Sequence, residues 1–220
     1  MSNFSLNFEV LPVTLPIFPL PNAVVMPGCQ LPLNIFEPRY LNMVFDALTE
    51  NRMIGMVQPE PERGDSKTES IYRTGTAGRI TFFNETSDGR LMIVLTGVCR
   101  FDITEEIPTS RGYLRAQVDW SRFRCDYDSM QAPDADKERK QLLRRLRDYF
   151  AMKQLETDWT ILERMETIDL INRLTCALPL DLAERQLLVE AVSTQDRIAS
   201  LMALLRYETI ETAPVPSRRH

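Results

Sequence analysis

The positions of glycine and proline divide this chain of 220 residues into two parts of different character. All eight glycines lie between Gly28 and Gly112, whereas Pro179 is the single proline between Asp134 and Ala213. Glycine and proline are typical of turns and edge strands, and long segments without them favour helices. The pattern therefore predicts a strand-rich first part and a helical second part.

The join between the two parts is predicted at residues 124–136. This segment is polar and acidic and contains Pro133, which is the composition of an exposed linker. The sequence thus predicts four regions along the chain. They are a β-rich lobe at 1–123, a linker at 124–136, a helical bundle at 137–210 and a disordered tail at 211–220.

Within the first part, apolar runs bounded by turn residues predict strands. The predicted strands are Leu15–Leu20, Gln30–Phe36, Met53–Val57, Thr74–Phe83, Arg90–Leu95, Val98–Ile107 and Tyr113–Phe123. The dipeptide Asp88-Gly89 predicts a tight hairpin turn, because glycine and aspartate tolerate positive φ angles. Residues 58–70 lack an apolar period and are predicted to form a mobile loop.

Helical periodicity occurs once in the first part and throughout the second. Residues 38–51 are predicted to form a helix that buries Leu41, Val44, Phe45 and Leu48. Further helices are predicted over 137–153 and 159–178. Two reciprocal capping pairs predict the starts of later helices, Asp181 with Glu184 and Ser193 with Asp196.

The residues needed for most enzyme chemistry are missing from the interior of the chain. The single histidine is His220, the last residue, so an internal imidazole base is absent. The cysteines at 29, 99, 125 and 176 form no C-x-x-C pair, and the segment 64–68 lacks the glycine that precedes the lysine of a P-loop. We therefore expect no catalysis, no cofactor and no bound metal.

Charge and hydropathy limit the partners. The net charge is −5, and the basic residues between 139 and 147 lie away from the apolar helix face with acidic residues on either side, at 134, 136, 138 and 148, so no nucleic acid is expected. The uncharged run from Val10 to Phe36 contains six prolines, which exclude a membrane helix. The first nine residues lack the basic start of a signal peptide, so a cytoplasmic location is expected.

Several segments closely resemble the N-terminal domain of Lon proteases. They are Leu15–Leu20, Val24–Gly28, Leu31–Tyr40, Leu95–Phe101 and Glu184–Leu188. The resemblance implies an α+β fold, with a PUA-like β-rich pseudo-barrel lobe followed by an all-helical bundle lobe. In the full protease this domain precedes ATPase and Ser/Lys peptidase modules, so the resemblance implies a free-standing, non-catalytic, bacterial-type relative.

The resemblance also implies a function in recognising unfolded or tagged polypeptides, with a protease or chaperone component as a further partner. Three alternatives remain open. The chain could be an assembly or regulatory subunit that binds one folded partner, a PUA-like RNA-binding module, or an unrecognised hydrolase. Exposed apolar grooves would favour polypeptide recognition, one flat apolar patch would favour a single folded partner, and a concave arginine-lined surface would favour RNA binding.

Five residues are candidates for a polypeptide-binding or interlobe surface: Glu37, Arg39, Tyr40, Phe82 and Phe83. The first three stand at a predicted helix start, where they could instead tie the helix to the sheet. The two phenylalanines are adjacent on a predicted strand and face opposite sides. One ring should therefore enter the core, and the other should meet solvent, the helical lobe or a partner.

Overall fold

The computed structural model describes residues 8–61, 70–127 and 135–211. Its contacts separate two compact units that do not follow chain order. The first unit combines Met1–Met130 with Asn172–Glu190, and the second combines Gln131–Ile171 with Ala191–His220.

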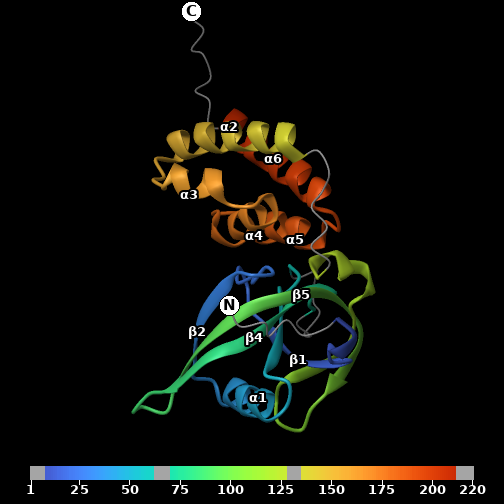
Figure 1. Cartoon of the computed structure of the whole chain (residues 1–220). Coiled ribbons are helices and arrows are strands. Elements are labelled where there is room, and N and C mark those ends of the chain that lie inside the picture. Colours follow the sequence, from blue (N-terminus) through green and yellow to red (C-terminus); the bar gives the residue numbers. More distant parts are fainter. Residues whose placement is uncertain (1–7, 62–69, 128–134, 212–220) are drawn as a thin grey trace, which may run out of the picture. The chain divides into compact units, whose positions relative to one another are not determined.

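The first unit is built on one six-stranded sheet (Figure 1). Its strands are β1 (Thr14–Pro19), β2 (Gln30–Ile35), β3 (Met53–Val57), β4 (Thr74–Glu85), β5 (Leu91–Pro108) and β6 (Leu114–Asp119). They are ordered β2-β5-β4-β3-β1-β6, and β5 also pairs with β6, so the sheet closes on itself. The predicted α+β class with a β-rich pseudo-barrel is confirmed.

One long strand, β5, replaces two predicted strands. It runs through Gly97, where an added Cβ would lie 2.1 Å from the carbonyl oxygen of Met26. Glycine is therefore needed for this close backbone approach, and it does not end the strand. The predicted hairpin turn joins β4 to β5, with Gly89 at a φ of 78°.

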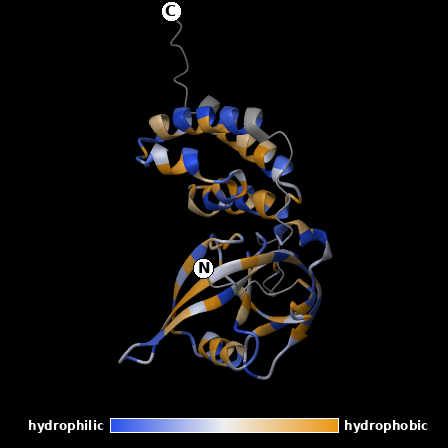
Figure 2. Cartoon of the chain, viewed as in Figure 1, coloured by the Kyte–Doolittle hydropathy of each residue, from blue (hydrophilic) through white to orange (hydrophobic). Residues whose placement is uncertain are grey.

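Buried side chains alternate with less buried ones along the first half of β5, and Figure 2 shows hydrophobic residues along much of the sheet. The buried residues form two apolar clusters in the first unit. One cluster holds the helix α1 (Pro38–Thr49) against the sheet, and the other is centred on Phe101 and Phe123.

The buried face of α1 differs from the predicted one. It consists of Tyr40, Met43, Val44 and Ala47, whereas Phe45 is exposed. Both stripes have the spacing i, i+3, i+4, i+7, so periodicity alone cannot choose between them. Tyr40 determines which stripe is buried, because its ring packs on Phe18 of β1 with the ring centroids 4.3 Å apart.

The first unit also includes part of the helical sequence. The helix α5 (Leu182–Glu190) contacts β4, and the end of α4 (Thr167–Ala177) contributes Asn172, whose amide donates to the carbonyl of Pro27 at 2.9 Å. The predicted helical lobe at 137–210 is therefore shared between the two units. Composition indicates which segments are helical, but packing against the sheet decides where α5 belongs.

The predicted linker at 124–136 is partly helical in the structure. Its first residues belong to the short 3-10 helix η2 (Ser121–Asp126), and α2 (Ala135–Lys153) begins before its end. Residues 128–134 of the linker lie outside the described part of the chain, as do most of the predicted loop at 58–70 and residues 212–220 of the predicted tail.

The second unit contains α2, α3 (Trp159–Arg164), the start of α4 and α6 (Thr194–Glu211). The predicted helix over 159–178 is interrupted, because Met165 has an extended backbone with a ψ of 144°. Leu142, Leu146 and Tyr149 of α2 are buried, as are Ile198, Leu201 and Leu205 of α6. No helix in the described ranges is long and apolar enough to cross a membrane.

The predicted capping pair of Asp181 and Glu184 is confirmed as reciprocal, and that of Ser193 and Asp196 is confirmed in one direction. The backbone N–H of Glu184 donates to Asp181 Oδ1 at 2.8 Å, and the N–H of Asp181 donates to Glu184 Oε2 at 2.9 Å. At the start of α6, the N–H of Asp196 donates to Ser193 Oγ at 3.0 Å. These contacts satisfy N–H groups that have no partner within the helix.

A buried ion pair joins β5, η2 and α5. The guanidinium of Arg100 donates to both carboxylate oxygens of Asp126, at 2.9 and 2.7 Å, and to the carbonyl of Val189 at 3.0 Å. Both side chains of the pair are almost completely removed from solvent. The guanidinium carbon also lies 4.3 Å from the ring centroid of Phe123.

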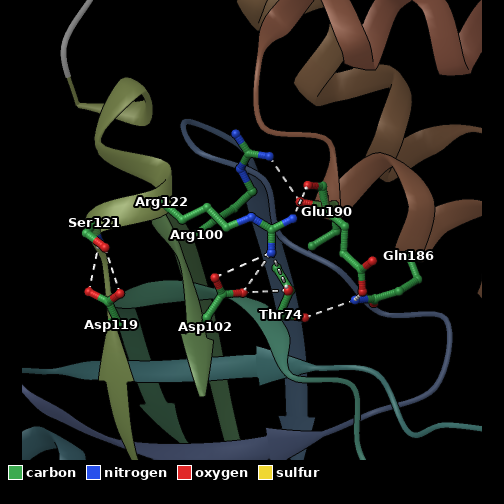
Figure 3. Close-up of polar contacts among 9 residues, drawn as sticks. Thr74, Arg100, Asp102, Asp119, Ser121, Arg122, Gln186 and Glu190 are labelled. Atoms are coloured by element: carbon green, nitrogen blue, oxygen red, sulfur yellow. Dashed lines mark hydrogen bonds and ion pairs between the residues drawn. The ribbon is translucent and has the colours of Figure 1, made fainter. Parts of the chain in front are cut away.

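A second polar cluster stands beside this pair (Figure 3). Arg122 donates to Asp102 at 3.2 Å and to the carbonyl of Glu190 at 3.1 Å. Thr74 donates to Asp102 at 2.6 Å, and Gln186 donates to the carbonyl of Thr74 at 3.1 Å. Together these hydrogen bonds hold α5 on the sheet, and each of the polar groups that they join has a hydrogen-bond partner.

We expect Asp126→Ala to lower the free energy of unfolding by about 3–5 kcal/mol, because it removes the carboxylate that neutralises the buried Arg100 guanidinium. Glu106→Ala is the matched control, since Glu106 forms an exposed pair with Arg73. Its cost should stay below about 1 kcal/mol. Urea unfolding measures both values, and equal costs for the two variants would show that the buried pair does not stabilise the fold.

Candidate functional site

The candidate residues at the start of α1 form a structural cluster. Glu37 makes no side-chain cap to the helix and instead accepts a hydrogen bond from Arg39 Nε at 3.0 Å. The Arg39 guanidinium carbon lies 4.5 Å from the ring centroid of Tyr40, and the Tyr40 ring is buried against Phe18. Tyr40 therefore attaches α1 to the sheet, whereas Glu37 and Arg39 remain half exposed.

The two phenylalanines lie at the hairpin end of β4, and neither ring enters the core. Phe82 is 51% exposed and Phe83 is 41% exposed. Phe82 is paired with Val94 and Phe83 with Ile93, so the rings project from opposite faces of the sheet as predicted. The expectation that one ring would be buried was wrong, because β4 continues beyond its last pair with β3, between Met53 and Arg79.

Two further exposed apolar residues lie at this end of the sheet. Met92 is 49% exposed and lies on the same face of β5 as Val94, the residue paired with Phe82. Phe36, directly after β2, is 62% exposed, and the guanidinium carbon of Arg90 lies 5.8 Å from its ring centroid. We call Phe36, Phe82 and Met92 the outer apolar patch.

The structure therefore separates the five predicted candidates. Phe82 belongs to the outer apolar patch, and Phe83 lies on the opposite face of the same strand. Glu37 and Arg39 adjoin the patch only through the chain neighbour Phe36, and Tyr40 lies in the core.

Phe36 and Met92 were missed at the sequence level, although both occur in predicted strands. Strand geometry alone places the side chain of Met92 on the opposite face from those of Leu91 and Ile93, although all three residues are apolar. Alternation does not reveal which face is covered, because that depends on α1 and on the strand order. Only the assembled sheet brings the ends of β2, β4 and β5 together.

The charges at the rim of the patch are largely balanced. Arg90 pairs with Asp88 at 3.0 Å, and Arg39 pairs with Glu37 at 3.0 Å. A hydrogen bond from the Thr86 hydroxyl lowers the pKa of Asp88, with smaller contributions from Arg90. The Asp88 carboxylate is therefore ionised at neutral pH, and the patch has no strong field of one sign.

The described residues offer little for catalysis or metal binding. Burial, together with the charge of Asp126, raises the pKa of the Cys99 thiol, which makes it a poor nucleophile. Over the described ranges, no three His, Cys, Asp or Glu side chains are grouped so that they could hold a metal ion. The exposed apolar surface at the hairpin end thus remains the main candidate for a site.

Comparison with protein families gives one match that spans most of the chain. Residues 14–206 match the model of the ATP-dependent protease La (LON) substrate-binding domain. The Lon protease of Anaeromyxobacter dehalogenans and Lon protease 2 of Myxococcus xanthus are each 27% identical over 205 residues, 91% of this chain and 24% of each relative. The Lon protease of Flavobacterium johnsoniae is 33% identical over 114 residues, 51% of this chain and 14% of that protein. The chain thus spans a quarter or less of these relatives.

Two solved structures share the fold. A Lon N-terminal domain protein from Xanthomonas campestris is 27% identical with a TM-score of 0.61, and the match covers 86% of this chain and 97% of that one. The N-terminal domain of a Mycobacterium avium complex Lon protease has a TM-score of 0.65 over 88% of this chain and 98% of that one. Its identity of 16% supports the fold alone.

The different environments of the aromatic residues generate a stability prediction. Phe82→Ala should change the free energy of unfolding by at most about 1 kcal/mol, because its ring is half exposed on a strand. Tyr40→Ala should cost about 3–5 kcal/mol, because it leaves a cavity between α1 and β1. Chemical denaturation of both variants distinguishes the two roles. A large loss for Phe82→Ala would show that its ring is needed for the fold.

Proposed function

Since the chain belongs to the family of Lon substrate-binding domains, we propose that it binds unfolded or tagged polypeptides, with the outer apolar patch as the contact surface. Family membership gives these 220 residues the role of a substrate-recognition module. The match is to the substrate-binding domain and not to the ATPase or peptidase modules, so this module is non-catalytic. A partner protease or chaperone, and the cytoplasmic location, stay predictions.

The proposal depends on one observation, the exposure of Phe82 and Met92 on a single face of the sheet, with Phe36 exposed directly after β2 and beside Arg90. Apolar surface gains about 25 cal/mol for each Å² removed from water, so three large side chains can supply useful binding energy. Large exposed side chains gathered on one face are typical of interaction sites. An unfolded client can provide the apolar side chains that cover them.

The expected affinity is modest. An extended client loses conformational freedom when it binds, and this loss offsets much of the energy of the apolar contacts. Micromolar or weaker binding, about −8 kcal/mol or less favourable, is therefore expected. Little sequence preference is expected, because the patch offers apolar contact and few directed polar groups.

The arrangement of basic residues gives less support to RNA binding. Two of the basic residues on α2 are bound within their own unit: Arg139 donates to the carbonyl of Glu163 at 2.9 Å, and Arg147 pairs with the Glu163 carboxylate. These guanidinium groups therefore position α3 against α2. RNA and a single folded partner remain as outcomes that the binding experiments can reveal.

The first experiment titrates reduced, carboxymethylated proteins against the chain and its variants. The double variant Phe82→Ser/Met92→Ser should bind at least about tenfold more weakly, since about 1.4 kcal/mol of apolar contact is lost. Leu187→Ser is the matched control, because Leu187 is exposed on α5 and outside the patch. It should bind as the unchanged chain does. Equal binding by all three proteins would exclude the patch as the contact surface.

Salt provides an independent test. Because the rim charges are paired and the net charge is only −5, client binding should change by less than about threefold between low and high salt. An RNA oligonucleotide is titrated in parallel at both salt concentrations. Tight, salt-sensitive RNA binding together with no affinity for the clients would contradict the proposal and favour the RNA-binding alternative.

A further inference from the structure

The hairpin end of β4 has an uncovered edge. The neighbouring strand β3 covers β4 only as far as Ile80, whose N–H donates to the carbonyl of Arg52 at 2.8 Å. Arg52 has a φ of 56° and connects α1 to β3, so β3 begins there. Within the described ranges no strand pairs with this edge of β4 along Thr81–Glu85, and Figure 1 shows the hairpin extending past the rest of the barrel.

The hydrogen bonds of the hairpin determine which main-chain groups point to this edge. The N–H of Thr86 donates to the carbonyl of Arg90 at 2.9 Å. Antiparallel pairs alternate between bonded and non-bonded, so Phe82 and Asn84 direct their main-chain groups to β5. Phe83 and Glu85 then direct their N–H and C=O groups away from β5. The uncovered edge therefore presents a row of donors and acceptors.

The sheet has another outer edge, on β2, and that edge is blunted. The N–H of Gly97 donates to the carbonyl of Cys29 at 2.9 Å, and the same alternation directs the main-chain groups of Gln30, Pro32 and Asn34 outward. Proline has no N–H, so the central donor of this row is missing. Proteins commonly protect edge strands in this way. The β4 edge has no proline along Thr81–Glu85.

We propose that an extended polypeptide segment adds to the β4 edge as a further strand, paired with Phe83 and Glu85. This inference rests on the proposed function, because it states how the same client is held. Alternate side chains of the added strand would lie beside Phe82 on one face and beside Phe83 on the other. Main-chain pairing supplies affinity that does not depend on client sequence, and the two exposed rings add apolar contact.

The residues along the edge favour a client segment over a second copy of this chain. Glu85 is the one charged residue of Thr81–Glu85 and is exposed, so it suits a client with a basic residue at the paired position. Two copies paired symmetrically about Phe83 would place Glu85 opposite Thr81, without charge complementarity. Five residues, about 17 Å of strand, also bury much less than the roughly 1,200 Å² of a stable dimer interface.

Amide hydrogen exchange measured by NMR tests this geometry in the unchanged chain, with a reduced, carboxymethylated protein as the probe. On client binding, exchange at Phe83 and Glu85 should slow by at least about tenfold, because their N–H groups acquire acceptors. Exchange at Gln30 and Asn34, on the β2 edge, should not change. Protection on β2 instead of β4, or no added protection while the client is bound, would overturn strand addition.

A pair of variants separates main-chain pairing from side-chain contact. Glu85→Pro removes one outward N–H and keeps both phenylalanines, whereas Glu85→Ala removes the same charge and keeps the N–H. Client binding should weaken about tenfold more in Glu85→Pro than in Glu85→Ala. This is the effect expected when one main-chain hydrogen bond to the client is lost and the proline ring hinders strand pairing at position 85. Circular dichroism and thermal unfolding establish that both variants fold.

The outcomes distinguish the two proposals. Equal client binding by Glu85→Pro and Glu85→Ala would contradict strand addition and leave the apolar patch as the contact surface. Absence of client binding to the unchanged chain would contradict the proposed function itself. Dimer formation that is lost in Glu85→Pro would show that a second copy, and not a client, occupies the edge.

Discussion

The first unit depends on the burial of one charge, that of Arg100. Removing a guanidinium from water is costly, and the cost is offset only when its donors are satisfied. Asp126 accepts two of its hydrogen bonds, the carbonyl of Val189 accepts another, and the ring of Phe123 covers it. One side chain on β5 therefore requires η2 and α5 to be in place. Around it, the bonds of Asp102 and Gln186 hold α5 on the sheet.

The same strand that carries this buried charge also forms the exposed hairpin. Beyond Gly97, β5 packs against η2 and is bonded to α5 through Arg100 and Val189, and towards Leu91 its strand partners are β2 and the end of β4. The first part is fixed by directed polar contacts, whereas the second carries the half-exposed Met92 and pairs with the part of β4 whose other edge is uncovered. If the proposed site is correct, stability and recognition are separated along one strand, and a client would bind without disturbing the ion pair.

Local features were predicted from the sequence, and long-range features were not. The strand β3, the turn at Gly89 and the capping pair of Asp181 with Glu184 depend on neighbouring residues, and all were predicted correctly. The exposure of both Phe82 and Phe83 depends on where β3 begins, which is set by the turn out of α1. The position of α5 on the sheet depends on partners more than 80 residues away, such as the Arg100 bond to Val189. Composition contains no information about such contacts.

The central claim is that clients contact the hairpin end of β4 and β5, and site-specific photo-crosslinking tests it most directly. A photoreactive phenylalanine derivative is placed at position 82 in one protein and at position 187, on α5, in another. Both are illuminated with the same unfolded client at equal concentration. The account requires strong crosslinking from position 82 and weak crosslinking from position 187. Equal yields, or a higher yield from position 187, would contradict it.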